Sequence, residues 1–265
     1  MHDTLLMVGC GNMSGAMLEG WLAAGHDPAR FIIVDPLRDV APGGLPVLRE
    51  LPAEGAFGAV LLGFKPQNLA EASPAVAALV GPDTLVLSLL AGIELPVLRR
   101  HFPAAHGHVR VMPNLAVLLG KAPVALCAEG LDPALADAVT ALMQPLGTPE
   151  WIGEDKFDLV TALAGSGPAF VYRFIDALGA AATRLGLPED QARQMALAMV
   201  EGASALAAAS PHDPGKLADM VASKGGVTRA GLDVLDNDGA LIRLATDTLR
   251  AARDRSVEMA RAARE

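Results

Sequence analysis

The sequence predicts an open, parallel β-sheet with helices on both of its faces, followed by a region built only of helices. Up to about residue 150, short and solidly apolar runs bounded by Gly, Pro or Asp alternate with helical stretches. From Gly153 onward no strand pattern occurs. Of the 265 residues, 52% are hydrophobic and 19% are charged, which is typical of a folded globular protein. We therefore expect two domains, residues 1–150 and residues 151–265.

The expected elements follow one another in a regular order. The strands are predicted in TLLMVG (4–9), RFIIVD (30–35), GAVLLGF (58–64), TLVLSLLAG (84–92), HVRVMPN (108–114) and PVALCA (123–128). Between them, helices are predicted in SGAMLEGWLAAG (14–25), NLAEASPAVAALV (68–80) and ELPVLRRHF (94–102). In the second domain, helices are predicted at about 154–185, 188–210, 213–223, 228–236 and 239–263. Pro188 and Pro214 support two of these starts, because a first helical turn tolerates the missing N–H of proline.

The composition argues against several classes of partner. The net charge of −9 and the pI of about 5.1 disfavour a nucleic-acid partner. The two cysteines, Cys10 and Cys127, cannot form a disulfide framework or a zinc ligand set, so no metal site is expected. We find no signal peptide and no run of the roughly 18 apolar residues that spans a bilayer, so we expect a cytoplasmic protein. The mean hydropathy of +0.36 favours helices that pack on one another in an oligomer.

A glycine turn, VGCGNMSG at residues 8–15, follows the first predicted strand. Gly9 allows the tight turn, and Gly11 lets the backbone approach a pyrophosphate at the N-terminus of the next helix. The third fingerprint position holds Ser14, where a small residue still permits close packing of helix on strand. After a strand and before a helix, this pattern predicts a Rossmann-type dinucleotide site. The residues of the turn assigned to the cofactor are Gly9, Cys10, Gly11, Asn12 and Met13.

The second predicted strand ends in Asp35, 20 residues beyond Gly15. A carboxylate there accepts hydrogen bonds from the adenosine ribose and repels a 2′-phosphate, which favours NAD(H). Arg38, three residues on, would attract that phosphate, so the preference between NADH and NADPH stays open. The alternative interpretation of Asp35 is a solvated acid at a strand end.

The proton donors of common reductases are missing. The single tyrosine, Tyr172, has Asp176 four residues on, so the Tyr-x-x-x-Lys pair of short-chain dehydrogenases is absent. The histidines of HFPAAHGH (101–108) have no acidic neighbour in the sequence, which disfavours a histidine acid. A hydride acceptor in this protein therefore needs little acid catalysis, as is true of a protonated imine.

Several segments resemble pyrroline-5-carboxylate reductases. In the order of that family, the chain carries VGCGNM, GFKPQN, SLLAGI, VRVMPN, VTALAGSGPAFVYRFIDAL, RLGLPEDQA and ASKGGVTRAGLDVL, from about residue 5 to beyond 235. The resemblance implies NAD(P)H-dependent reduction of Δ1-pyrroline-5-carboxylate to L-proline, the last step of proline synthesis. It also implies a Rossmann domain followed by an all-α dimerisation domain that interlocks with a second subunit, in a homodimer or a larger homo-oligomer.

The same resemblance assigns residues to the two ligands. Those assigned to the cofactor, besides the glycine turn and Asp35, are Phe64, Lys65, Pro66, Ala91, Gly92 and Asn114. Those assigned to the substrate are Lys65, Glu154, Ser223, Gly225, Gly226, Val227 and Thr228. The glycines before Thr228 let successive N–H groups turn towards one carboxylate, and the Thr228 hydroxyl would meet the ring nitrogen as the catalytic group. Alternatively, Thr228 is a plain N-cap and Glu154 only favours a helix start.

Three positions depart from the family. Relatives usually have proline at Lys224, Thr-Pro at Leu115–Ala116 and a polar residue at Met220. These differences leave a related cyclic imine open as the substrate. A β-hydroxyacid dehydrogenase is a second alternative, although the chain has no lysine between Lys156 and Lys216, where that class has its catalytic lysine. A third is a non-enzymatic, nucleotide-binding assembly protein.

Overall fold

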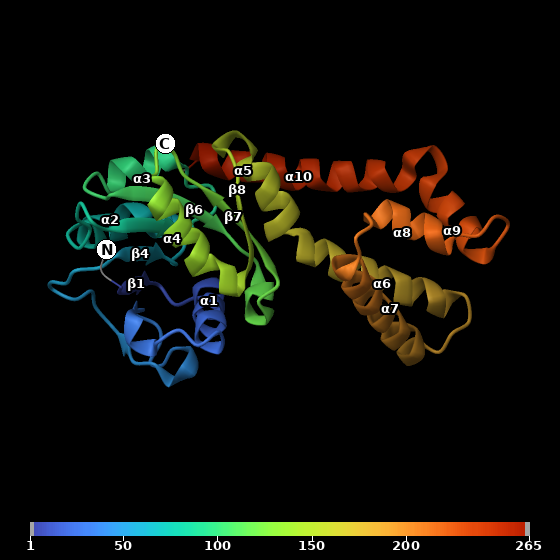
Figure 1. Ribbon diagram of the computed structural model, residues 1–265, viewed down its shortest axis with the longest axis horizontal. Coiled ribbons are helices and arrows are strands. Elements are labelled where there is room, and N and C mark those ends of the chain that lie inside the picture. Colours follow the sequence, from blue (N-terminus) through green and yellow to red (C-terminus); the bar gives the residue numbers. More distant parts are fainter. Residues whose placement is uncertain (1–2, 263–265) are drawn as a thin grey trace. The chain divides into compact units, whose positions relative to one another are not determined.

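The structure is a computed structural model that describes residues 3–262 (Figure 1). By their contacts, the described residues fall into two compact units. Unit 1 holds the chain up to Ser166 and again from Ala251 onward, and unit 2 holds Gly167–Arg250. The predicted domain boundary between residues 150 and 151 falls inside the last strand of unit 1, and the division into residues 1–150 and 151–265 stays a prediction.

Unit 1 is built on one sheet of eight strands. They are β1 (Leu5–Val8), β2 (Phe31–Val34), β3 (Val47–Leu48), β4 (Ala59–Leu62), β5 (Leu85–Ser88), β6 (Gly107–Met112), β7 (Ala122–Cys127) and β8 (Gly147–Trp151). Their order in the sheet is β3-β2-β1-β4-β5-β6-β7-β8. All neighbours are parallel except β6 and β7. The first six strands have the order of a dinucleotide-binding Rossmann sheet, which confirms the predicted fold class.

Helices cover both faces of this sheet, because successive residues of each strand point to opposite sides. On one face, Leu5 and Met7 belong to a core cluster with Trp21 of α1 (Asn12–Ala23) and Met143 of α4 (Pro133–Met143). On the other, Leu6 and Val8 belong to a cluster shared by α2 (Leu69–Ala77), α3 (Leu95–His101) and α5 (Glu154–Val160). Burial on both faces explains why the predicted strands read as solidly apolar runs.

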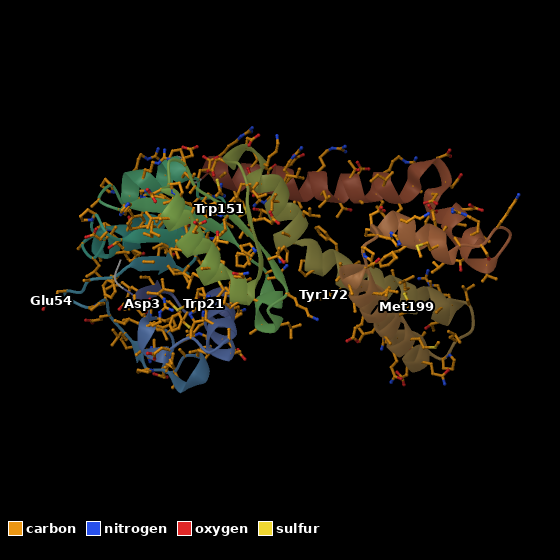
Figure 2. The ribbon with its side chains drawn as sticks, viewed as in Figure 1. Asp3, Trp21, Glu54, Trp151, Tyr172 and Met199 are labelled. Atoms are coloured by element: carbon orange, nitrogen blue, oxygen red, sulfur yellow. The ribbon has the colours of Figure 1, made fainter. Side chains whose placement is uncertain are left out.

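Unit 2 contains only helices. They are α6 (Gly167–Arg184), α7 (Glu189–Ala209), α8 (Pro214–Val221), α9 (Val227–Asp236) and the first part of α10 (Ala240–Ala262). The start signals are confirmed: Glu189 and Asp190 lie in the first turn of α7, and Asp213 caps α8 at the Lys216 N–H with Pro214 as the first helical residue. Large apolar side chains of α6 and α7 are exposed, among them Tyr172 and Met199, which Figure 2 labels.

The helix predicted at 154–185 is divided into three pieces. A π-helical turn at Thr161–Gly165 separates α5 from α6, and the Ser166 N–H donates to Thr161 O. Pro168 has no N–H to donate to Ala164 O, four residues earlier, so the regular helical ladder cannot continue there. Three further differences are β3 and β8, which the sequence did not predict as strands, and α4, where no helix was predicted. In the part of the chain that the structure describes, no helix is long and apolar enough to cross a membrane.

Candidate active site

The candidate cofactor residues follow the carboxyl ends of neighbouring strands. In the register of the sheet, Val8 pairs with Val34 on one side and Leu62 on the other, and Leu62 pairs with Ser88. The strand order reverses between β1 and β4, and ligands of open α/β sheets bind outside this edge. The structure thus places at one edge the residues predicted for the cofactor: Gly9–Met13, Asp35, Phe64–Pro66, Ala91, Gly92 and Asn114.

The glycine turn requires glycine at position 9 for two reasons. Gly9 has φ +90°, a conformation that L side chains rarely adopt. A Cβ atom there would lie 2.7 Å from the backbone nitrogen of Phe64 and 2.8 Å from the carbonyl carbon of Gly63. The turn after β1 and the turn after β4 therefore touch backbone to backbone. This close approach excludes any side chain at position 9, the position that a dinucleotide fingerprint reserves for the tight turn.

Ser14 explains why the third fingerprint glycine is dispensable here. Its buried hydroxyl donates to Gly9 O at 2.8 Å and ties the first turn of α1 to the glycine turn. Gly63 provides the space, because a Cβ atom there would lie 2.7 Å from Ser14 Oγ. In this chain, the glycine that allows close packing of helix on strand is therefore Gly63, after β4, and not a residue of α1.

The N-terminus of α1 fits an anion. The N-cap residue, Gly11, has no side chain to accept hydrogen bonds from the first N–H groups, and the first turn holds no acidic residue. The N–H groups of Asn12 and Met13 point out of the helix start with the positive end of its dipole. Together with the bare glycine turn, this donor set fits the pyrophosphate of a dinucleotide.

Asp35 supports the glycine turn from the end of β2. It is only 8% exposed. Its Oδ2 accepts from the Cys10 N–H at 2.7 Å and its Oδ1 from the Leu37 N–H at 2.8 Å. The interpretation of Asp35 as a solvated acid is therefore wrong. Arg38 makes no hydrogen bond or ion pair with the described residues, so both a carboxylate and a free guanidinium stand beside the turn.

The turns after β4 and β5 differ in how tightly they are held. Lys65 is exposed and forms no ion pair within residues 3–262, and the following Pro66 opens a short 3₁₀ turn. Gly92 is buried with φ +76°, and a Cβ atom there would lie 3.2 Å from the backbone nitrogen of Ala260 in α10. The turn that carries Ala91 and Gly92 is thus packed against the last part of α10, which belongs to the same unit.

Asn114 joins two elements through its amide. Its Oδ1 accepts from the Ala116 N–H at 2.9 Å and caps the 3₁₀ helix Leu115–Leu119. Its Nδ2 donates to Ala164 O at 2.9 Å, the carbonyl for which Pro168 has no N–H. The buried side chain is therefore occupied by protein partners, and only the backbone of Asn114 is left to face a cofactor.

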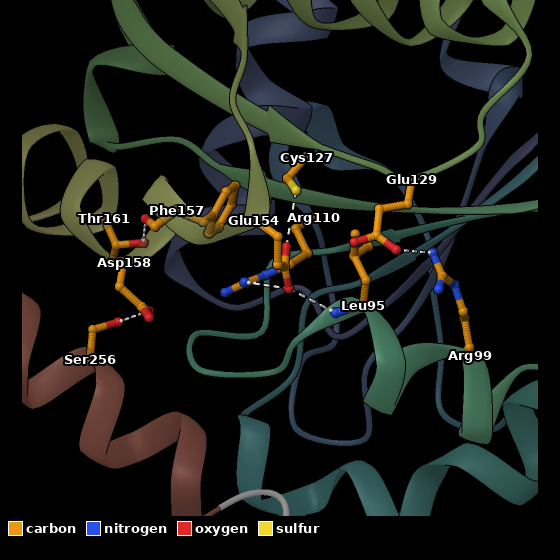
Figure 3. A network of polar contacts seen from close by, with 10 residues as sticks. All are labelled: Leu95, Arg99, Arg110, Cys127, Glu129, Glu154, Phe157, Asp158, Thr161 and Ser256. Atoms are coloured by element: carbon orange, nitrogen blue, oxygen red, sulfur yellow. Dashed lines mark hydrogen bonds and ion pairs between the residues drawn. The ribbon is translucent and has the colours of Figure 1, made fainter.

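Glu154 lies at the centre of a polar network (Figure 3). Its Oε1 accepts from Leu95 N–H at 3.1 Å and from Arg110 Nη1 at 3.1 Å. Its Oε2 accepts from the Cys127 thiol at 3.0 Å. The Arg110 guanidinium also lies over the Phe157 ring, 4.0 Å from its centre. The first residue of α5 is thereby bound to α3, β6 and β7.

The two thiols of unit 1 stay protonated at neutral pH. Burial raises the pKa of Cys10. Burial and the adjacent Glu154 carboxylate raise the pKa of Cys127 to about 12. Neither thiol is therefore an activated nucleophile, and Cys127 acts as a hydrogen-bond donor. Among the described residues, no group of three or more His, Cys, Asp or Glu side chains could hold a metal ion.

The predicted substrate loop lies in unit 2, between α8 and α9. Gly225 has φ +73°, Gly226 is the N-cap of α9, and a Cβ atom at Gly226 would lie 2.6 Å from Ser223 Oγ. Thr228 is the second residue of α9, so its interpretation as the N-cap is wrong. Its exposed hydroxyl has no partner among residues 3–262. A bare helix start followed by a free hydroxyl fits a small carboxylate with a ring nitrogen.

Two cations next to this loop differ in their surroundings. Arg229 is engaged by aspartates, with Nε 2.8 Å from Asp233 and Nη2 2.8 Å from Asp236. Lys224 is exposed and has no ion-pair partner within the described part of the chain. Of these two cations, only Lys224 has a charge that is not already paired with an aspartate, and a ligand carboxylate could pair with it.

Ser14, Gly63 and Arg110 were not among the residues predicted for the site. Arg110 carries a signal that could have revealed it, since it is the one charged residue within the apolar run HVRVM. A charge inside a buried strand requires a buried partner. No comparable signal identifies Gly63, whose role depends on the position of Ser14 in space.

The fold and this edge define a class of protein: a Rossmann-type dinucleotide-binding protein followed by a helical region. Within this class, a family model described as pyrroline-5-carboxylate reductase dimerisation matches residues 154–259. Pyrroline-5-carboxylate reductase 2 of Bacillus subtilis is 31% identical over 271 residues, 97% of each chain. The pyrroline-5-carboxylate reductase of Pisum sativum is 34% identical over 89% of each chain. The chain therefore belongs to the pyrroline-5-carboxylate reductase family.

Solved structures agree with this assignment. A pyrroline-5-carboxylate reductase from Coxiella burnetii has a TM-score of 0.87 at 27% identity, covering 97% of this chain and 98% of that one. The Plasmodium falciparum pyrroline carboxylate reductase, whose structure has NADP bound, has a TM-score of 0.81 at 22% identity and the same coverage. The fold is thus shared over nearly the whole length.

Proposed function

We propose that this protein reduces Δ1-pyrroline-5-carboxylate to L-proline with NAD(P)H. The observation that carries the proposal is similarity to a reductase of this name over 97% of both chains. The glycine turn, open to a pyrophosphate, and the bare start of α9, open to a carboxylate, support it. The nicotinamide, when bound, supplies a hydride to the imine carbon.

The residues of the protein bind and orient in this mechanism. The N–H groups of Val227 and Thr228 at the start of α9 hold the substrate carboxylate, whereas the Gly226 N–H donates to Ser223 O at 2.9 Å. The Thr228 hydroxyl is placed to hydrogen-bond the ring nitrogen. The iminium form already carries its proton on nitrogen, so gain of a hydride at carbon gives the neutral secondary amine without a protein acid. Positioning therefore contributes more than acid–base catalysis.

The assembly that we propose is a homodimer or a larger homo-oligomer in the cytoplasm. The match to the family's dimerisation model covers residues 154–259, which include all of unit 2. Several large apolar side chains of α7 are more than half exposed: Met195, Leu197, Met199 and Leu206. A second copy of the chain would remove these from water.

A steady-state panel tests the reaction. Pyrroline-5-carboxylate and its six-membered homologue are each offered with NADH and with NADPH, and nucleotide oxidation is followed. We expect turnover of the five-membered imine, and Gly226→Val to abolish most of it, because the new side chain meets Ser223. A wild-type protein without turnover of any cyclic imine would contradict the proposal and favour a non-enzymatic role.

The six-membered or substituted imine is a second candidate for one reason. Leu115 is 51% exposed and Met220 is 58% exposed, at positions where relatives usually have polar or smaller residues. Leu115 lies in unit 1 and Met220 in unit 2, and at each position an apolar side chain leaves a more apolar substrate open. A higher kcat/KM for the homologue than for pyrroline-5-carboxylate would favour this candidate.

We expect Asp35 to set the relative affinity for NADH and NADPH, which the panel compares. Each oxygen of its carboxylate accepts one backbone N–H and can accept a second hydrogen bond, from a ribose hydroxyl of NADH, whereas Arg38 attracts a 2′-phosphate. In Asp35→Asn we expect the ratio of NADPH to NADH affinity to rise roughly tenfold, or about 1.4 kcal/mol. The matched control is Asp39→Asn, which removes a nearby exposed carboxylate bound to Arg49. An unchanged ratio in Asp35→Asn would exclude Asp35 from nucleotide selection.

A further inference from the structure

Glu154 is the first residue of α5, and its carboxylate has three donors from three other elements. Leu95 N–H and Arg110 Nη1 both donate to Oε1 at 3.1 Å, and Cys127 Sγ donates to Oε2 at 3.0 Å (Figure 3). The Glu154 side chain is 22% exposed and that of Arg110 is 4% exposed. Both carboxylate oxygens are therefore directed into unit 1 and engaged there.

The surroundings supply only donors to this carboxylate. Arg110 is buried, and Phe157 covers its guanidinium. The Cys127 thiol, with its pKa raised to about 12, donates throughout the physiological range. Both oxygens of Glu154 therefore face donors only.

One donor connects this network to the cofactor edge. Leu95 is the first residue of α3, and its N–H has no partner within that helix. Between the end of β5 and this residue lies the turn that carries Ala91 and Gly92. Leu90, Ile93 and Leu95 of this segment are buried. The turn is thus held at Gly92 by α10 and at Leu95 by Glu154.

We infer that Glu154 is a positioning residue, which holds the Ala91–Leu95 turn for the nucleotide through the Leu95 N–H, and that it does not contact the imine substrate. The inference rests on the proposed function in that the turn is taken to bind NAD(P)H. It replaces the expectation that Glu154 lines the substrate pocket, because its two oxygens already face three donors of the protein.

The test separates nucleotide binding from substrate binding. In Glu154→Met, the side chain has nearly the same length but no oxygen to accept a hydrogen bond, so the hydrogen bond to Leu95 and the ion pair to Arg110 are both lost. We expect the NAD(P)H Kd, measured by nucleotide fluorescence without substrate, to rise at least tenfold. The KM for the cyclic imine at saturating nucleotide should change less than twofold. Amide hydrogen exchange should accelerate in the segment 91–95.

Two further variants keep the test decisive. Glu154→Asp retains the charge beside Arg110 but is one carbon too short to reach Leu95, so it should fold and should also raise the nucleotide Kd. Asp155→Asn is the matched control, because it makes the same charge change at the next residue, whose exposed carboxylate forms an ion pair with the neighbouring Lys156. It should behave as the wild type in all three measurements.

Two results would overturn the inference. One is a tenfold rise in the imine KM with an unchanged nucleotide Kd, which would place Glu154 against the substrate. The other is unchanged exchange of the 91–95 amides in both Glu154 variants. A wild-type protein without reductase activity would contradict the proposed function alone, since the exchange measurement still decides whether Glu154 holds the turn.

Discussion

At the glycine turn, the space around single atoms decides which residue is tolerated. Gly9 combines a positive φ with a backbone neighbour at 2.7 Å from a would-be Cβ atom. Asp35 and Ser14 then fix the turn with hydrogen bonds to Cys10 N–H and Gly9 O. The pyrophosphate cradle is therefore a property of three strand ends and of α1 together.

The first prediction compares two glycines with nearly the same φ. Gly25 has φ +87° and nothing within 4 Å of a would-be Cβ atom, whereas Gly9 has φ +90° and a backbone clash. We expect Gly25→Ala to cost about 1 kcal/mol from conformation alone. Gly9→Ala should cost about 3 kcal/mol, since overpacking adds to the strain. Chemical denaturation measures both, and equal losses would show that the close approach of Phe64 is unimportant.

The second prediction concerns Cys127 and alkaline pH. Its pKa is raised from 9.0 to about 12 in the folded protein. The unfolded chain loses this proton first, so the stabilisation is complete below pH 9 and is lost as the pH rises towards 12. Over this window, Cys127→Ser should remove a slope of up to about 1.4 kcal/mol per pH unit from the free energy of unfolding. Cys10 is present in both the wild type and the variant, so the difference between their free energies of unfolding reports Cys127. If the two free energies change with pH in parallel, the pKa shift of Cys127 is refuted.

At the scale of elements, helix α5 connects several elements of unit 1 through hydrogen bonds. Glu154 at its start binds α3, β6 and β7, and Asp158 accepts from Ser256 of α10 at 2.7 Å. After α5, the π-helical turn offers Ala164 O to Asn114. The segment GSGP (165–168) therefore ends a regular helix and creates an acceptor, which Asn114 uses.

The third prediction tests this acceptor. Asn114→Ala leaves the buried Ala164 carbonyl without its donor and removes the cap at Ala116 N–H. We expect a loss of about 3 kcal/mol in the free energy of unfolding. Asn68→Ala is the control, because Asn68 is the exposed N-cap of α2 and makes no capping hydrogen bond. Similar losses in the two variants would contradict the role of Asn114.

At the scale of the whole molecule, the two units bury their apolar residues to different extents. In unit 1 the strands and the helices that cover them form two closed core clusters. In unit 2 only a few residues are buried, for example Ala192 and Ala196 of α7. Helix α10 belongs to both units, up to Arg250 in one and from Ala251 in the other.

The fourth prediction concerns self-association. Met195 and Met199 lie one helical turn apart on α7 and are 63% and 51% exposed. We expect the wild type to sediment as a dimer or larger, and the double variant Met195→Glu, Met199→Glu to dissociate at least a hundredfold more readily. Gln191→Glu, on the same helix, adds charge at a position that is already polar. A wild type that sediments as a monomer would contradict the proposed assembly.

The sequence predicted those features that depend on neighbouring residues and missed those that depend on contacts between residues far apart in the chain. The strand runs and helix starts depend on neighbouring residues, and they are confirmed within a few positions. The strands β3 and β8 were not predicted, because two residues and the polar GTPEW carry no strand pattern. Glu154 was assigned to the substrate, because no local pattern indicates that its oxygens meet Leu95, Arg110 and Cys127.

The sequence by itself determined the Rossmann sheet, the helical region after it, the glycine turn and the family, since each depends on local periodicity or on motifs of a few residues. Only the tertiary structure decided that Gly63 makes room for Ser14, that Asp35 is buried against Cys10, and that Glu154 faces inward. These pairings join residues 25 to 59 positions apart, and only the folded backbone brings their atoms within hydrogen-bonding distance.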